Sequence, residues 1–127
     1  MVVVSIDINN LKKINDSFGH EAGDAYIVNC CQLLCKTFRN SPVYRIGGDE
    51  FAVLLMEEDF KNRDELFLKM RDRMKEIASQ DPAPEERVSI AGGIAVFENG
   101  NDLKVADVFT RADAAMYDDK VEIKKIL

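Results

Sequence analysis

Two short, mostly apolar runs separated by an acidic glycine turn constrain the fold more than any other feature. The runs are residues 43–46 and 51–56, and residues 47–50 between them read Gly-Gly-Asp-Glu. This pattern predicts a β-hairpin in which glycine provides the positive φ angles of a tight turn. Such a hairpin carries two adjacent carboxylates, Asp49 and Glu50, at its tip. The chain has 127 residues, enough to bury the hairpin in one domain with its own core.

The rest of the chain alternates strand-like and helix-like segments. Residues 2–8 form a β-branched run typical of a buried strand, and residues 87–97 predict another strand, in which Gly92-Gly93 indicates a bulge or a close approach of backbone. Helices are predicted at residues 11–18, 20–38 (with Tyr26, Cys30 and Leu34 on its apolar face), 62–79 (with Asn62 as N-cap) and 102–117, and a last edge strand at 121–127. The expected fold is α+β, a mostly antiparallel central sheet flanked by helices.

Composition and charge exclude several classes of function. Lysine and arginine number 17 against 23 aspartates and glutamates, a net charge of −6, so we expect no binding to nucleic acid backbones. No apolar run approaches the roughly 18 residues of a membrane span. The three cysteines, Cys30, Cys31 and Cys35, fall within an apolar helical pattern. We expect them to pack in the core of a cytoplasmic protein, and a weak metal site is the alternative.

Acidic residues at strand ends form the first candidate site. Asp7 lies near the end of the first predicted strand, and Asp49 and Glu50 lie in the hairpin turn. Neighbouring carboxylates repel each other and raise each other's pKa unless a cation lies between them. If the strand end and the hairpin tip meet, Mg²⁺, which prefers oxygen ligands, fits there. The alternative is that these turn acids are simply solvated.

A second candidate site follows the first strand. Main-chain N–H groups at a helix start, together with Lys12, can hold phosphate oxygens. The Asp24 carboxylate can accept both N–H donors of a guanine edge, with the Asn15 amide adding a contact, whereas adenine lacks that pair of donors. The alternative is that Asn15, Asp16 and Asp24 cap helices. His20, the only histidine, is expected to be a turn residue at a helix start rather than a catalytic base.

Two lysines near the end of the chain form a third candidate group. Lys120 and Lys124 are four residues apart, after the last predicted helix. They can approach the same edge of the sheet and neutralise phosphate charge. The alternative is an ordinary solvated surface for both.

Three blocks of sequence, in order and at compatible separations, resemble the GGDEF domain of diguanylate cyclases. Residues 7–24 resemble the family's upstream block, residues 45–51 (Arg-Ile-Gly-Gly-Asp-Glu-Phe) match its signature, and residues 112–120 resemble its downstream helix. The likeness covers essentially the whole chain. It implies a fold like that of nucleotidyl cyclases and polymerase palms, with residues 1–127 forming one GGDEF domain. It also implies a fragment that lacks the family's N-terminal helix.

The resemblance implies condensation of two GTP molecules into cyclic di-GMP, with release of two pyrophosphates. By matched position, Asp7, Asp49 and the Ile8 carbonyl bind Mg²⁺, with Mn²⁺ as the alternative metal. Asp49 and Glu50 are the implied catalytic residues, and Glu50 lies near the attacking 3′-hydroxyl. The implied substrate-binding residues are Lys12, Asn15, Asp24, Gly48, Lys120 and Lys124.

The symmetry of the product implies two facing pockets and therefore a homodimer. The resemblance also implies a sensor domain ahead of this one in the parent protein. Asn9, Leu11 and Lys124 depart from the aspartate, aromatic residue and arginine that the family often has there, and residues 39–42 do not match its product-inhibition motif. These departures leave open two alternatives, a catalytically inactive GTP-binding or regulatory GGDEF module and a plain scaffold.

Overall fold

The computed structural model describes residues 2–96 and 105–126, and within them the fold is α+β with an antiparallel sheet, as predicted. The sheet has the strand order β2-β3-β1-β4, and every neighbouring pair is antiparallel. The strands are β1 (Val2–Ile8), β2 (Val43–Arg45), β3 (Glu50–Leu54) and β4 (Ile90–Val96). The central position of β1 places its end between the β2–β3 hairpin and the start of β4.

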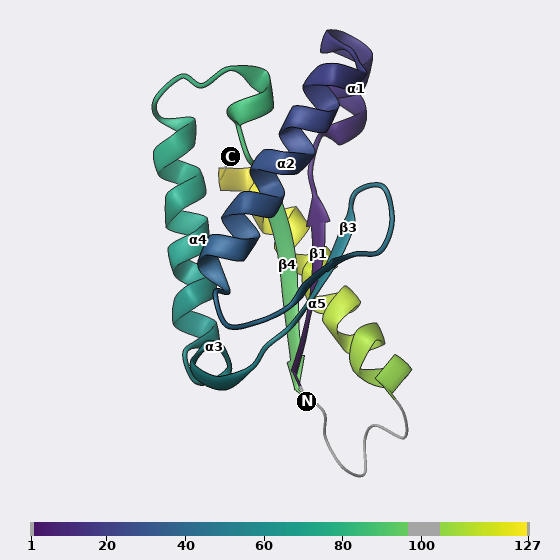
Figure 1. Cartoon of the computed structure of the whole chain (residues 1–127), viewed down its shortest axis with the longest axis vertical. Coiled ribbons are helices and arrows are strands. Elements are labelled where there is room, and N and C mark those ends of the chain that lie inside the picture. Colours follow the sequence, from purple (N-terminus) through teal and green to yellow (C-terminus); the bar gives the residue numbers. More distant parts are fainter. Residues whose placement is uncertain (1, 97–104, 127) are drawn as a thin grey trace.

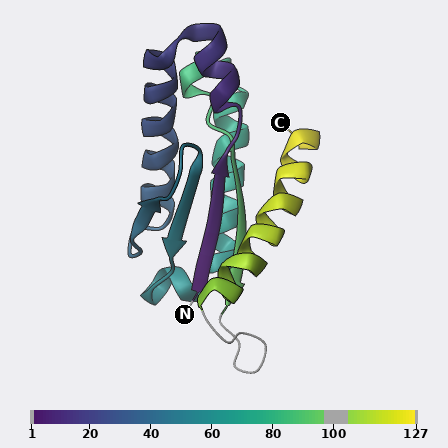
Figure 2. The same ribbon diagram turned by 90° about the vertical axis from the view of Figure 1, so that its right-hand side faces the viewer.

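Helices cover both faces of this sheet. Their bounds are α1 (Leu11–Phe18), α2 (His20–Thr37), α3 (Glu57–Lys61), α4 (Arg63–Ala78), the short η1 (Pro84–Glu86) and α5 (Val105–Ile126). Figure 1 shows α2 and α4 in front of the sheet, and Figure 2 shows α5 on the opposite side. In Figure 1, α1 lies at the top of the molecule, the hairpin tip lies below it at the upper right, and α3 lies at the lower left. No helix within the described ranges combines the length and the apolar character needed to span a bilayer.

Strand β1 reads as one apolar run, but its two faces differ. Val4, Ile6 and Ile8 are at most 1% exposed and belong to the main core. Successive side chains of a strand point to opposite faces, so Ser5 and Asp7 point the other way, toward α5. Ser5 donates a hydrogen bond to Asp113 of α5, and Asp7 accepts one from the same helix. One face of β1 therefore holds the core and the other carries polar groups.

The predicted edge strand at residues 121–127 is wrong, because α5 continues to Ile126. Val108, Ala112 and Ile123 are buried, and Met116 packs against the core. These residues are separated by four, four and seven positions, a single helical stripe that extends past the predicted helix end. Packing of this stripe on the sheet keeps the last residues helical.

The structure contradicts two of the conformations predicted for the glycines and confirms a third feature. The β1–β4 ladder runs without interruption through Gly92 and Gly93, so a bulge is wrong and a close approach is confirmed. A Cβ on Gly93 would collide with the backbone of α5 at Ala112 and Met116. The positive φ predicted for the hairpin glycines is also wrong, since Gly19 alone among the described glycines has one, at 92°. The Glu50 carbonyl instead accepts from the main-chain N–H groups after β2, in a wider turn.

Two further details of the helices differ from expectation. Asn62 precedes α4, as predicted for an N-cap, but its side chain makes no capping hydrogen bond. Cys30 is fully buried, and burial raises the pKa of its thiol to about 12, as expected for a core cysteine. Cys35 is exposed, so the core prediction is wrong for that residue.

Candidate functional site

The end of β1 and the hairpin tip meet at one edge of the sheet. Asp7 lies directly opposite Glu50 in the β1–β3 register, and directly opposed residues present their side chains on the same face. The main-chain N–H of Ile8 donates to the carbonyl of Asp49 at 2.9 Å. Asp49 is also close enough for its carboxyl to raise the pKa of Asp7. The structure therefore brings Asp7, Asp49 and Glu50 together.

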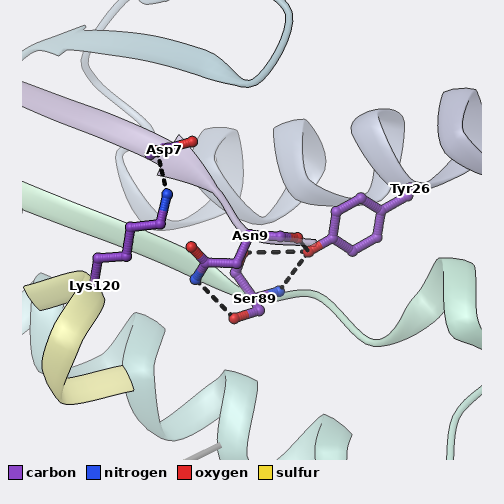
Figure 3. A network of polar contacts seen from close by, with 5 residues as sticks. All are labelled: Asp7, Asn9, Tyr26, Ser89 and Lys120. Carbon is purple, nitrogen blue, oxygen red and sulfur yellow. Dashed lines mark hydrogen bonds and ion pairs between the residues drawn. The ribbon is translucent and has the colours of Figure 1, made fainter. Parts of the chain in front are cut away.

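The surroundings of Asp7 disfavour the charged form of its carboxyl group. It is only 9% exposed, and burial raises its pKa above the ordinary value. A hydrogen bond and the positive charge of Lys120 act against that rise, whereas Asp49 adds to it. Lys120 Nζ lies 2.9 Å from Asp7 Oδ2 (Figure 3), while Asp7 Oδ1 is buried without a hydrogen-bond partner. An unpartnered carboxylate oxygen beside a second carboxylate fits a cation.

The donor chemistry of this edge suits a hard divalent metal. Asp7 and Asp49 offer carboxylate oxygens, and the main chain of Ile8 adjoins both. The described residues contain no group of three or more histidine, cysteine, aspartate or glutamate side chains that would enclose a metal. Mg²⁺ is commonly held by one or two carboxylates and completed by water and substrate phosphates. The residues present fit such an open, substrate-completed site.

A pocket of about 350 Å³ lies beside these acids, within the size range of ligand sites. Four of the predicted site residues line it: Lys12, Asn15, Gly48 and Asp49. The other lining residues are Leu11, Asp16 and His20. A Cβ built on Gly48 meets nothing within 4 Å, so the hairpin tip has open space at this position. His20 begins α2, as expected of a residue at a helix start, and it also faces this pocket.

The guanine-reading candidates lie where α1 turns back into α2. Asn15 belongs to α1, and its side chain lies so close to the α-carbon of Gly23 in α2 that a Cβ there would overlap the amide. Asp24 is the next residue of α2 and is exposed. It does not line the pocket itself. The close approach at Gly23 thus brings Asn15 near the turn of helix that carries Asp24.

The capping alternative for these residues is wrong. The N-cap of α1 is Asn10 and that of α2 is Gly19, and neither makes a side-chain capping bond. Asn15, Asp16 and Asp24 all lie within helices. Their side chains therefore make no capping hydrogen bonds at the helix ends.

The structure describes the side chain of only one of the two candidate lysines of α5. Lys120 is one-third exposed and points at Asp7, so it is not a fully solvated surface lysine. Lys124 belongs to α5, but its side chain lies outside the described residues.

Arg45 is a residue of this site to which sequence reasoning assigned no role. Its Nε donates to the carbonyl of Gly47 at 3.2 Å, and its Nη2 donates to that of Gly48 at 2.9 Å. The guanidinium thereby braces the wide hairpin turn that carries Asp49. The sequence signal for this role is an arginine two residues before a glycine pair, from which its side chain can reach the carbonyl groups of the turn.

A second missed feature is the network around Tyr26 (Figure 3). Its hydroxyl donates to the carbonyl of Asn9 at 2.6 Å and accepts from the main-chain N–H of Ser89 at 3.2 Å. The Asn9 amide Nδ2 donates to Ser89 Oγ at 3.0 Å. Sequence periodicity placed Tyr26 on the apolar face of its helix, and the signal overlooked was that a buried tyrosine needs a hydrogen-bond partner.

Known proteins with a similar sequence or fold point to one family. The family model "Diguanylate cyclase, GGDEF domain" matches residues 1–125. The chain is 32% identical over 121 residues to the probable diguanylate cyclase DgcT of Escherichia coli (strain K12), covering 93% of this chain and 26% of that protein. It is also similar to the active GGEEF domain of a diguanylate cyclase from Vibrio cholerae, with a TM-score of 0.76 and 29% identity over 95% of this chain and 76% of that one.

A second similar structure concerns the binding of a ligand. It describes the interaction between a microbial GGDEF domain and cyclic di-GMP, with a TM-score of 0.64 and 32% identity over 95% of this chain and 70% of that one. The chain spans about a quarter of the length of the Escherichia coli relative, 26%, so the match concerns one domain of a longer protein there. On the match over residues 1–125, the chain belongs to the GGDEF domain family of diguanylate cyclases.

Proposed function

We propose that the chain condenses two GTP molecules into cyclic di-GMP. In each of two equivalent steps, a 3′-oxygen attacks the α-phosphorus of the other GTP, a new P–O bond forms, the α–β bridging bond breaks, and pyrophosphate and the hydroxyl proton leave. The observation that carries the proposal is the meeting of buried Asp7 with Asp49 beside a pocket lined by Lys12, Asn15 and Gly48. Family membership supports the same reaction.

Asp7, Asp49 and the Ile8 carbonyl would hold the divalent metal, with Mg²⁺ favoured by the oxygen donors and Mn²⁺ as the alternative. When bound, the metal would lower the pKa of the attacking hydroxyl and neutralise phosphate charge. Glu50 shares a sheet face with Asp7 and would lie near that hydroxyl. Catalysis at phosphorus depends largely on such positioning and charge stabilisation.

The remaining residues would bind the two ends of GTP. Lys12 lines the pocket and Lys120 reaches its acidic edge, so both would hold triphosphate oxygens, as would Lys124. Asn15 and Asp24 would read guanine, because a carboxylate pairs with the two adjacent donors of that base and is left unpaired by adenine. The open backbone at Gly48 would admit the nucleotide.

A homodimer would complete the reaction, since each pocket holds one GTP and the product contains two identical bonds. Because GTP is a cytoplasmic nucleotide, the proposed reaction would take place in the cytoplasm. A non-catalytic GTP-binding module is the second candidate, favoured by the Lys120–Asp7 ion pair, which already engages one of the oxygens proposed to bind the metal.

Turnover separates the two candidates. The protein that contains this chain is incubated with GTP and MgCl₂ at concentrations at which dimers form, and cyclic di-GMP is measured by chromatography. The cyclase is supported if the wild-type protein forms cyclic di-GMP and the Asp49→Ala variant does not, although the variant keeps the circular dichroism spectrum of the wild type. GTP binding without product supports the module.

A further inference from the structure

The hydroxyl of Tyr26 joins three segments that meet at the edge of the proposed site. Tyr26 lies on α2 and is fully buried. Its single proton goes to the carbonyl of Asn9, the shorter contact at 2.6 Å, and its oxygen accepts from the N–H of Ser89 at 3.2 Å. Asn9 directly follows β1 and Ser89 directly precedes β4. The ring thus spans from α2 to the adjoining ends of two strands (Figure 3).

The Asn9 carbonyl belongs to the turn that connects the proposed metal ligands to the proposed phosphate-binding helix. Asp7 and Ile8 come just before it, and α1 with Lys12 comes just after Asn10. Asn10 has a left-handed backbone, with φ of 68°. A non-glycine residue holds that conformation only where its surroundings determine it. The Tyr26 hydroxyl is a fixed contact of this kind, made by a side chain outside the turn.

Burial keeps the Tyr26 hydroxyl protonated and therefore able to donate this hydrogen bond. Burial raises the pKa of the Tyr26 phenol well above its ordinary value, so the group remains a proton donor. Asn9 and Ser89 are 7% and 8% exposed, and they line one wall of a pocket of about 230 Å³. Loss of the hydroxyl would leave the carbonyl and the N–H without this partner in a buried position.

The other end of the link is the base-reading part of the site. Asp24 lies two residues before Tyr26 on the same helix, and a helix is stiff over that distance. A displacement of α2 relative to the end of β1 would therefore move Asp24 relative to Asp7. In productive geometry, the guanine of one GTP and its triphosphate must be held at the same time.

We propose that Tyr26 is a positioning residue whose hydroxyl sets the placement of Asp24 on α2 relative to Asp7 and Ile8 on β1. It touches neither nucleotide nor metal and acts through the Asn9 carbonyl and the Ser89 amide. This inference rests on the proposed function and adds to it the residue that connects base recognition to the acidic edge.

The test replaces Tyr26 by phenylalanine, which removes only the hydroxyl. The matched control is Ser41→Ala, because the Ser41 hydroxyl likewise donates to a buried group, Asp59 at 2.7 Å, and accepts a main-chain N–H, that of Met56 at 3.1 Å. Ser41 contacts Asp59 of α3, and α3 lies far from α1 and the hairpin tip in Figure 1. Both variants are compared for melting temperature, for kcat of cyclic di-GMP formation and for the Mg²⁺ concentration that half-saturates GTP binding.

We expect both variants to lose stability, Tyr26→Phe the more because its contacts are the more buried, and Tyr26→Phe alone to lose activity. Its kcat should fall by about 10- to 100-fold, the scale of a misplacement near 1 Å, with a several-fold rise in the half-saturating Mg²⁺ concentration. A Tyr26→Phe enzyme no more impaired than Ser41→Ala overturns the positioning role. A wild-type protein that neither binds GTP nor forms product overturns the proposed function itself, and the inference with it.

A wild-type measurement decides the matter if Tyr26→Phe does not fold. Hydrogen exchange is followed with Mg²⁺ and 3′-deoxy-GTP, which lacks the attacking hydroxyl and cannot react. The Ser89 amide, bonded to Tyr26, should exchange more slowly when the nucleotide is bound, whereas the Met56 amide, bonded to Ser41, should not change. Unchanged exchange at Ser89 in a nucleotide-bound protein overturns the inference.

Discussion

The ammonium of Lys120 lies 2.9 Å from the carboxylate of Asp7, although the two residues are 113 positions apart in the sequence. The contact joins the last helix to the end of the central strand. It supplies positive charge to an acid that burial and Asp49 both disfavour in its charged form. Because Lys120 engages one oxygen of Asp7 and the other has no hydrogen-bond partner, the acidic edge is only partly compensated.

The first prediction concerns pH. The raised pKa of Asp7 means that the folded state binds this proton more tightly than the unfolded state, so stability falls as pH rises from about 3.8 through the folded-state pKa. Without metal, Asp7→Asn should therefore raise the melting temperature near pH 7, because asparagine resembles the neutral acid. The gain should shrink toward about pH 3, where Asp7 is protonated in both states. Melting curves that show the same difference at both pH values would contradict this account.

The second prediction concerns the choice of base. Asp24→Asn should reduce the preference for GTP over ATP by about 10-fold or more, because an amide cannot accept two adjacent donors, and a lost charged hydrogen bond is worth about 1.5–3 kcal/mol. Binding of the two nucleotides is measured by titration calorimetry. Glu21→Gln, an exposed acid one turn earlier on α2, is the matched control and should keep the wild-type preference. Equal selectivity in both variants would remove Asp24 from the base site.

The third prediction concerns the phosphates. Lys12→Gln should raise the Kd for GTP by about 10-fold, equivalent to about 1.4 kcal/mol, through loss of a charge-assisted contact. Lys13→Gln changes the charge of the protein equally, and Lys13 is exposed as Lys12 is but does not line the pocket, so the Kd of this variant should stay near that of wild type. If the two variants weaken binding equally, the effect is only one of net charge.

The fourth prediction contrasts two glycines. Gly93→Ala should destabilise the fold by about 1–3 kcal/mol or more, since its Cβ would meet the backbone of α5. Gly48→Ala has room for its Cβ and should keep wild-type stability while weakening GTP binding. Denaturant unfolding and nucleotide titration measure the two effects. A destabilised Gly48→Ala, or an unaffected Gly93→Ala, would show that the packing at these positions differs from that described.

Much of the architecture was predictable from local pattern. The β-branched run at β1, the acidic glycine turn and the apolar stripes of α2 and α4 all lie where their periodicity indicates. The end of α5 was not predictable in this way. The weak alternation of apolar and polar residues after residue 120 favours a strand, and the helical stripe that includes Met116 and Ile123 is recognisable only once both are known to pack in or against the core. The geometry of the hairpin turn was also missed, since Arg45 rather than left-handed glycine holds it.

The sequence by itself determined which residues are the candidates for chemistry, because Asp7, Lys12, Asn15, Asp49 and Lys120 stand at recognisable positions in three ordered blocks. Only the tertiary structure decided which of them meet. Periodicity encodes which face of a strand or helix is apolar, but it does not encode which other element that face packs against. The ion pair of Asp7 with Lys120 and the contact of Tyr26 with Asn9 both depend on how helices dock on the sheet. That docking results from burial summed over the whole core, and no local stretch of sequence contains it.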